Sequence, residues 1–142
     1  ASKEFGSQCI VVSIDVKTSA GFNRVVTEGG TRLTAHVPEE WAKQVEDLGA
    51  GEILLNSIDR DGMKTGYDLD LLRKVTARVH IPVIACGGVG EWGHFAEALK
   101  QTNVDAVAAS NIFHFCDQSV YLARQFLFEQ GFNVRRPELL EV

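Results

Sequence analysis

The sequence predicts an α/β fold with a parallel sheet, built from one strand-then-helix unit that is used four times. Two observations point to this fold: short apolar runs alternate with segments of helical spacing, and the apolar runs are nearly continuous. Strands of that kind are typical of parallel sheets that are covered on both faces. The chain has 142 residues and is 45% hydrophobic, which fits one core and not two. We therefore expect residues 1–142 to form a single domain.

The first unit joins a β-branched strand at residues 9–15 to a helix at residues 38–50. A proline at the first helical position, early acids and a closing glycine mark the ends of that helix. The connection between them, residues 16–37, is long and is interpreted as a short hairpin or a mobile lid. The other three units are expected at residues 52–59 with 68–79, 81–88 with 94–102, and 105–110 with 119–131.

Two architectures remain open on this pattern. Four βα units are half of what a (β/α)8 barrel requires, so the chain would be a (βα)4 half-barrel, half of a TIM barrel. An isolated half would leave two open sheet edges, and we expect a second half or self-association to cover them. The alternative is a small doubly wound α/β domain, which also uses four or five parallel strands.

Composition and charge exclude several classes of function. The net charge is −5 with both signs interspersed, so the basic stripe of a general nucleic-acid binder is missing. The sequence has no membrane-length apolar run and no basic-then-apolar leader, although a segment upstream of its abrupt start could carry a targeting signal. The cysteines are odd in number and far apart, which fits the cytoplasm. The histidines are also scattered, so we expect neither a metal nor a cofactor. The cysteines are Cys9, Cys86 and Cys116, and the histidines are His36, His80, His94 and His114.

Polar side chains gather just past the first two strands, where parallel α/β folds bind ligands. Asp15 ends the first strand, and Asn56, Asp59 and Asp61 follow or end the second. A single aspartate at a strand end is structural about as often as it is functional. Both strands end in Ser-Ile-Asp, however, and this repetition favours chemistry.

The last two strands end in loops that predict a phosphate site. Gly87 and Gly88 would allow backbone N–H groups to approach an anion, and Ser110 would add a hydroxyl from the next loop. Alone, the Gly-Gly pair is more typical of a tight turn. Arg60 and Lys64 are interpreted as solvated loop charges.

Several stretches together resemble a known family. They are "SQCIVVSIDVK", "GAGEILLNSIDRDGMKTGYD", "IPVIACGGVG", "HFAEAL" and "AASNIFHF". They resemble the C-terminal half of the cyclase subunit (HisF) of imidazole glycerol phosphate synthase, a (β/α)8 barrel of histidine biosynthesis. A ribotide isomerase of the same pathway shares the RDG loop and the Gly-Gly turn. "GYD" and "AASNIFHF" favour the cyclase.

The resemblance implies a lyase reaction and a role for each matching residue. The cyclase makes imidazole glycerol phosphate and an aminoimidazole carboxamide ribotide from a phosphoribulosyl-formimino precursor and ammonia. Two aspartates, one in each barrel half, act as acid and base; Asp15 matches the C-terminal one, the general acid. Asn56 and Asp61 match substrate-binding positions. The positions that hold the glycerol-side phosphate match Gly62, Gly87, Gly88, Ala109 and Ser110.

The resemblance also implies partners. Glu52 matches a charged ring at the bottom of the barrel, the ammonia gate, where a glutaminase subunit delivers ammonia. The chain would need an N-terminal half-barrel for activity. Cys86 stands where the family usually has serine, and residues 137–142 are interpreted as a non-native or disordered tail. A non-catalytic phosphate-binding half-barrel that self-associates, and a purely structural module, remain as alternatives.

Overall fold

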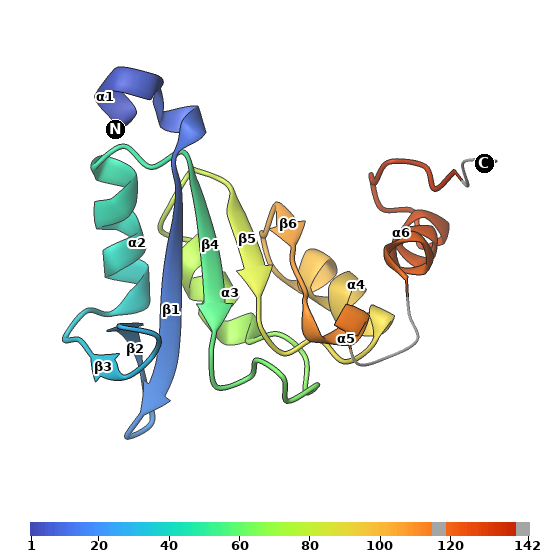
Figure 1. Ribbon diagram of the computed structural model, residues 1–142, viewed down its shortest axis with the longest axis horizontal. Helices are drawn as coiled ribbons and strands as arrows, with labels where there is room; N and C mark the ends of the chain where they lie inside the picture. Colours follow the sequence, from blue (N-terminus) through green and yellow to red (C-terminus); the bar gives the residue numbers. More distant parts are fainter. Residues whose placement is uncertain (115–118, 139–142) are drawn as a thin grey trace.

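The computed structural model describes residues 1–114 and 119–138, which form an α/β structure with one sheet (Figure 1). Most of the predicted tail, residues 139–142, lies outside the described residues, as does Cys116. The strands are β1 (Val11–Ser19), β2 (Phe22–Thr27), β3 (Arg32–Leu33), β4 (Glu52–Ser57), β5 (Val83–Cys86) and β6 (Ala106–Val107). The helices are α1 (Ser2–Phe5), a 3₁₀ turn (Ser7–Cys9), α2 (Pro38–Asp47), α3 (Leu69–Thr76), α4 (Trp92–Gln101), α5 (Asn111–His114) and α6 (Val120–Glu129).

The sheet confirms the four predicted βα units. Its strand order is β3-β2-β1-β4-β5-β6, and β1, β4, β5 and β6 run parallel to one another. This is the arrangement of a half-barrel. Helices α2, α3, α4 and α6 follow these four strands in turn.

The first strand differs from its predicted bounds. It begins at Val11, because residues 7–9 form a 3₁₀ turn, and it continues to Ser19. Beyond Asp15 it pairs with β2 in an antiparallel hairpin, and β2 pairs with β3. The long connection is therefore a hairpin, one of the two predicted forms. The sheet is not purely parallel, because the hairpin adds two antiparallel strands at one edge.

Helices cover only one face of the parallel strands, so the expected cover on both faces is wrong for this chain alone. Ile14, Val16, Ile53 and Leu55 point to the covered face and are almost fully buried against α2, α3 and α4. The alternate residues of the same strands are exposed or half-buried. We call this second side the inner face; it consists of Val11, Ser13, Asp15, Glu52, Leu54, Asn56, Ile84 and Cys86.

The helix ends follow the capping signals in the sequence. Pro38 opens α2 with Glu39 and Glu40 in its first turn, where negative charge suits the helix dipole. The Asp68 side chain accepts a hydrogen bond from the Leu71 N–H at 3.1 Å and caps α3. These residues mark where α2 and α3 begin behind the sheet.

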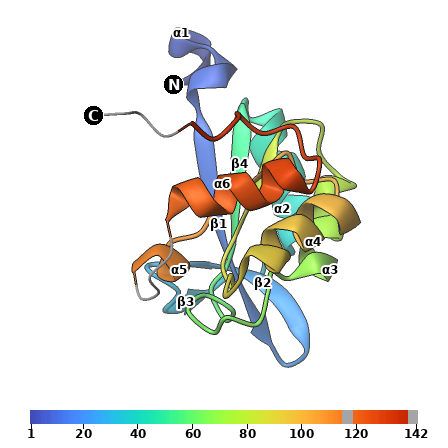
Figure 2. The same cartoon turned by 90° about the vertical axis from the view of Figure 1, so that its right-hand side faces the viewer.

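Helix α6 packs beside α4 at the β6 edge of the sheet (Figure 2). Phe128 on α6 is 45% exposed, whereas Phe126 packs against the core, as their spacing of two residues predicts. Across residues 1–114 and 119–138, no helix is both long and apolar enough to span a bilayer.

Candidate functional site

Two predicted site residues, Asp15 and Asn56, lie in one row across the sheet. Cys86, which directly precedes the predicted Gly87, completes this row. Asp15 on β1 is the register partner of Asn56 on β4, and Asn56 is the partner of Cys86 on β5. All three belong to the inner face. Asn56 and Cys86 lie at the carboxyl ends of their strands, and Asp15 lies near the end of the part of β1 that pairs with β4. Parallel strands with this register bring together side chains that are 41 and 30 residues apart in the sequence.

Asn56 holds the carboxylate of Asp15 in place. Its Nδ2 donates a hydrogen bond to Asp15 Oδ1 at 3.2 Å. Its own Oδ1 is buried and has no hydrogen-bond partner within the described part of the chain. An unpaired buried acceptor is costly, and a ligand donor would satisfy it. The row therefore offers a positioned carboxylate beside a free amide oxygen.

The predicted phosphate residues line a small cavity next to this row, which we call the cradle. Its volume is about 50 Å³, several times the space that one water needs. It brings together three loops. They are the loop after β4 that contains Arg60, Asp61 and Gly62 (the RDG loop), the loop after β5 that contains Gly87 and Gly88 (the Gly-Gly loop), and the loop after β6. The cradle is lined by Asp61, Cys86, Gly87, Gly88, Val89, Ala109, Ser110 and Asn111.

Two glycines permit the close packing of these loops. Gly87 and Gly88 have φ values of +91° and +106°, which other residues rarely adopt. A Cβ on Gly88 would lie 2.2 Å from the Gly66 carbonyl oxygen, and one on Gly87 would lie 2.5 Å from that of Ser57. Gly62 lies beside the cradle, because a Cβ there would be 3.1 Å from Asn111 Nδ2. Only glycine fits at Gly87 and Gly88.

The cradle presents backbone donors that are suited to an anion. Within the described ranges, the N–H groups of Gly88, Ala109 and Ser110 donate to no protein acceptor. Unpaired backbone N–H groups on neighbouring loops are a usual means of binding phosphate oxygens. The Asp61 carboxylate on the rim opposes an anion, and this opposition limits the affinity for a free ion.

Cys86 connects the row to the cradle, and its thiol stays protonated. Burial, followed by the negative charges of Asp61 and Asp15, raises the pKa of Cys86 above its ordinary value, while the Gly87 N–H acts in the opposite direction. A neutral thiol is a weak hydrogen-bond donor. Among the described residues, no group of three or more His, Cys, Asp or Glu side chains could hold a metal ion.

Asp59 and Arg60 stabilise loops and do not line the cradle. Asp59 Oδ2 accepts a hydrogen bond from the Thr18 N–H at 2.6 Å, which ties the RDG loop to the β1–β2 hairpin. The second Ser-Ile-Asp therefore does not repeat the first, because Asp59 lies beyond its strand and Asp15 lies within one. Arg60 donates to the Gly66 carbonyl and lies 3.9 Å from the Asp68 carboxylate, so it is more than a solvated charge.

Glu52 lies at the opposite end of the inner face. It is the first residue of β4 and precedes Asn56 by four residues, which corresponds to about 13 Å along a strand. It is half-buried and belongs to the same face as Asn56. This is the end where the family resemblance locates an ammonia gate.

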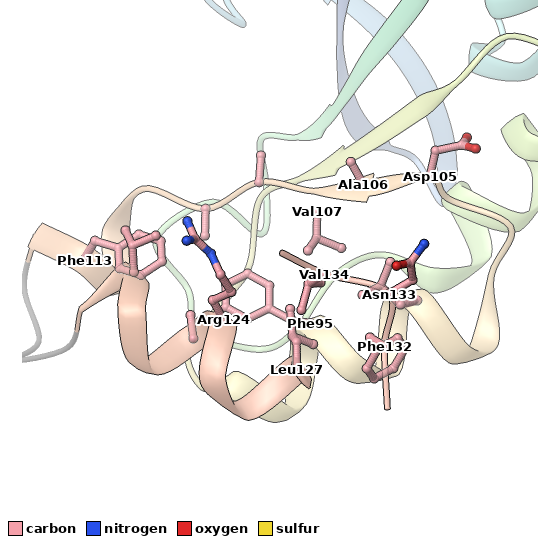
Figure 3. A pocket seen from close by; sticks show the side chains of 15 residues that line it. Phe95, Asp105, Ala106, Val107, Phe113, Arg124, Leu127, Phe132, Asn133 and Val134 are labelled. Carbon is pink, nitrogen blue, oxygen red and sulfur yellow. The ribbon is translucent and has the colours of Figure 1, made fainter. Parts of the chain in front are cut away.

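A larger cavity, which the sequence did not indicate, lies away from this edge. It has a volume of about 700 Å³ between β6, α4, α6 and the segment after α6 (Figure 3). Phe95, Val107, Leu127 and Phe132 line it, and Arg124 is its main cation. It lies at the strand that ends the sheet, since β6 pairs only with β5 in the described chain.

Comparison with known proteins agrees with this geometry. The model of the histidine biosynthesis protein family matches residues 1–119. The chain belongs to this family. It is 46% identical over 134 residues to imidazole glycerol phosphate synthase subunit HisF of Chlorobium phaeobacteroides and 45% identical to that of Pelodictyon phaeoclathratiforme.

These alignments cover 94% of the chain but only 53% of each relative. The chain therefore spans about half the length of the curated relatives that it matches. Together with the parallel βα units, this coverage agrees with half of a barrel. The family also matches the resemblance drawn from the RDG and Gly-Gly loops.

Proposed function

We propose that this chain is the C-terminal half of a cyclase of histidine biosynthesis, active when an N-terminal half-barrel completes it. The completed enzyme would make imidazole glycerol phosphate and an aminoimidazole carboxamide ribotide from a phosphoribulosyl-formimino precursor and ammonia. The main support is that Asp15 and the cradle share one edge of one sheet face. The HisF relatives provide independent support.

The geometry suggests separate roles for Asp15 and the cradle. Asp15 and Cys86 are two strands apart, a separation of about 10 Å, which suits a small phosphorylated ligand. The cradle would hold the glycerol-side phosphate through the N–H groups of Gly88, Ala109 and Ser110, with Gly62 and Gly87 shaping the loops. Asp15 would then act as the general acid, with Asn56 and Asp61 in contact with the substrate. The second aspartate would come from the other half.

The position of Glu52 supports the proposal that a partner subunit binds at the other end of the barrel. A carboxylate on the inner face, about 13 Å from the reacting row, fits a gate through which ammonia enters from a glutaminase subunit. We place this subunit at the amino ends of the strands, away from the cradle. No cofactor is required by this scheme.

One observation favours a second candidate. The inner face is uncovered. In the described chain, residues 11–14 of β1 have no neighbouring strand on the side away from β4, and β6 has none on the side away from β5. A half-barrel that binds phosphate and pairs with a second copy of itself would cover the same surfaces without catalysis. It would bind the anion but lack the second aspartate.

Reconstitution separates the two candidates. The chain would be produced together with the N-terminal half of the Chlorobium phaeobacteroides relative, and assembly would be checked by light scattering. We expect ammonia-dependent turnover from the assembled pair and none from either half alone. An assembled pair that binds phosphate but shows no turnover would contradict the proposal of a cyclase. It would favour the second candidate, a phosphate-binding half-barrel that self-associates.

A further inference from the structure

We propose that Tyr67 is a positioning residue for the cradle, because its hydroxyl holds the Ala108 carbonyl and thereby sets the direction of the Ala109 N–H. This inference rests on the proposed phosphate-binding role of the cradle. Tyr67 is not among the residues that line the cradle, and its hydroxyl bonds to the backbone beside it. It would act through the backbone of the loop after β6.

The Tyr67 hydroxyl makes a single directed bond. The side chain is 4% exposed, and Oη donates to the Ala108 carbonyl oxygen at 2.8 Å. The ring packs against Phe95 of α4, with centroids 6.4 Å apart. Burial raises the pKa of Tyr67 far above its ordinary value, so the hydroxyl remains a donor at any pH that the protein would meet.

Ala108 is held from both sides. Its N–H donates to the Ala85 carbonyl at 2.8 Å, and its carbonyl accepts from Tyr67. A trans peptide is planar, and its C=O and N–H point in opposite directions. Fixing the Ala108 carbonyl therefore also fixes the Ala109 N–H, which points away from Tyr67. That N–H belongs to a cradle residue and has no protein acceptor in the described chain.

The residue before Tyr67 connects a second loop to the same arrangement. The Gly66 N–H donates to the Gly88 carbonyl at 2.8 Å, so the segment 66–67 bonds to the loops after both β5 and β6. A phenylalanine at position 67 would preserve the ring packing and this backbone bond. It would remove only the bond to Ala108, which makes the substitution selective.

The test compares phosphate binding by two tyrosine variants. The chain contains only two tyrosines, and Tyr121 on α6 is a matched control. The 142-residue chain would be labelled with ¹⁵N and titrated with inorganic phosphate. We expect Tyr67→Phe to weaken binding by roughly 3- to 10-fold, the range of one neutral hydrogen bond. Tyr121→Phe should bind as wild type does, and all three proteins should be folded at the assay temperature.

A second measurement keeps the Tyr67 hydroxyl and applies if Tyr67→Phe does not fold. In the Tyr121→Phe background, 3-fluorotyrosine labels position 67 alone. Its ¹⁹F resonance should shift with phosphate at the same midpoint as the Ser110 amide. An unmoved resonance, or equal affinity of a folded Tyr67→Phe, would overturn the positioning role. Absence of binding by folded wild type would instead refute the cradle, and the positioning role with it.

Discussion

At Gly88 two loops approach more closely than any side chain would allow. A Cβ there would lie 2.2 Å from the Gly66 carbonyl oxygen, and the φ of +106° disfavours other residues. We expect Gly88→Ala to lower the free energy of unfolding by about 3–4 kcal/mol, since backbone strain and overpacking add. Chemical denaturation measures this change.

Gly21 is the matched control for Gly88. Its φ is +80°, but nothing lies within 4 Å of a Cβ built there. Gly21→Ala should therefore show only the backbone penalty, about 1–2 kcal/mol. Equal losses for the two variants would contradict the claim that the loops of the cradle pack through Gly88.

At the same scale, the sequence indicated the residue types of the site but not their partners. Asp15 and Asn56 were both expected at the sheet edge, yet their hydrogen bond depends on a strand register that no local pattern records. Asp59 shares the Ser-Ile-Asp motif and has a structural role, because it lies past its strand. Tyr67 was visible only as part of "GYD", since its effect depends on a residue 41 positions away.

At the scale of elements, Glu46 links α2 to the segment between α3 and β5. Its Oε1 accepts from the His80 and Ile81 N–H groups at 2.7 and 3.2 Å, and its Oε2 lies 2.7 Å from Lys43 Nζ. We expect Glu46→Ala to lower the free energy of unfolding by about 1–3 kcal/mol, because two backbone donors lose a charged acceptor. Thermal or urea unfolding measures it. Asp47→Ala, which removes only an exposed contact to Lys43, should change stability by less than about 0.5 kcal/mol.

The same carboxylate gives the link a pH dependence. The hydrogen bond from Lys43 is the largest effect and lowers the pKa of Glu46, and the two backbone N–H groups act in the same direction against partial burial. Because the pKa is lower in the folded state, the stabilisation is present above the ordinary glutamate range and disappears as the pH falls below it. The stability difference between wild type and Glu46→Ala should shrink below about pH 4. A difference that is constant from pH 7 to pH 3 would contradict this.

The elements themselves were largely predictable, with two exceptions. Proline and early acids marked the start of α2, because capping is local chemistry, and the Asp68 cap of α3 was not recognised. The extension of β1 to Ser19 was not predicted, since its polar end is held by pairing with β2 and not by its own apolar pattern. The apolar runs also suggested cover on both faces, and only one face is covered within this chain.

At the scale of the whole molecule, unpaired edges and an uncovered inner face predict association. We expect the isolated chain at micromolar concentration to form dimers or larger species, because open strand edges are templates for pairing. Light scattering after gel filtration measures this, and adding a complementary N-terminal half should replace the self-association. A stable monomer would contradict the half-barrel fold if the amides that point outward, away from β4 in residues 11–14 and away from β5 in β6, were protected.

Asp15→Asn in the reconstituted barrel tests whether Asp15 is the general acid of the proposed cyclase. Proton transfer at Asp15 is proposed to be separate from anion binding at the cradle, so the variant should lose roughly 10²-fold or more in ammonia-dependent turnover. Its phosphate affinity should fall by no more than about 2-fold, and Asp70→Asn, at an 82% exposed side chain, should match wild type in both. Turnover by Asp15→Asn near the wild-type level would show that Asp15 is not the acid.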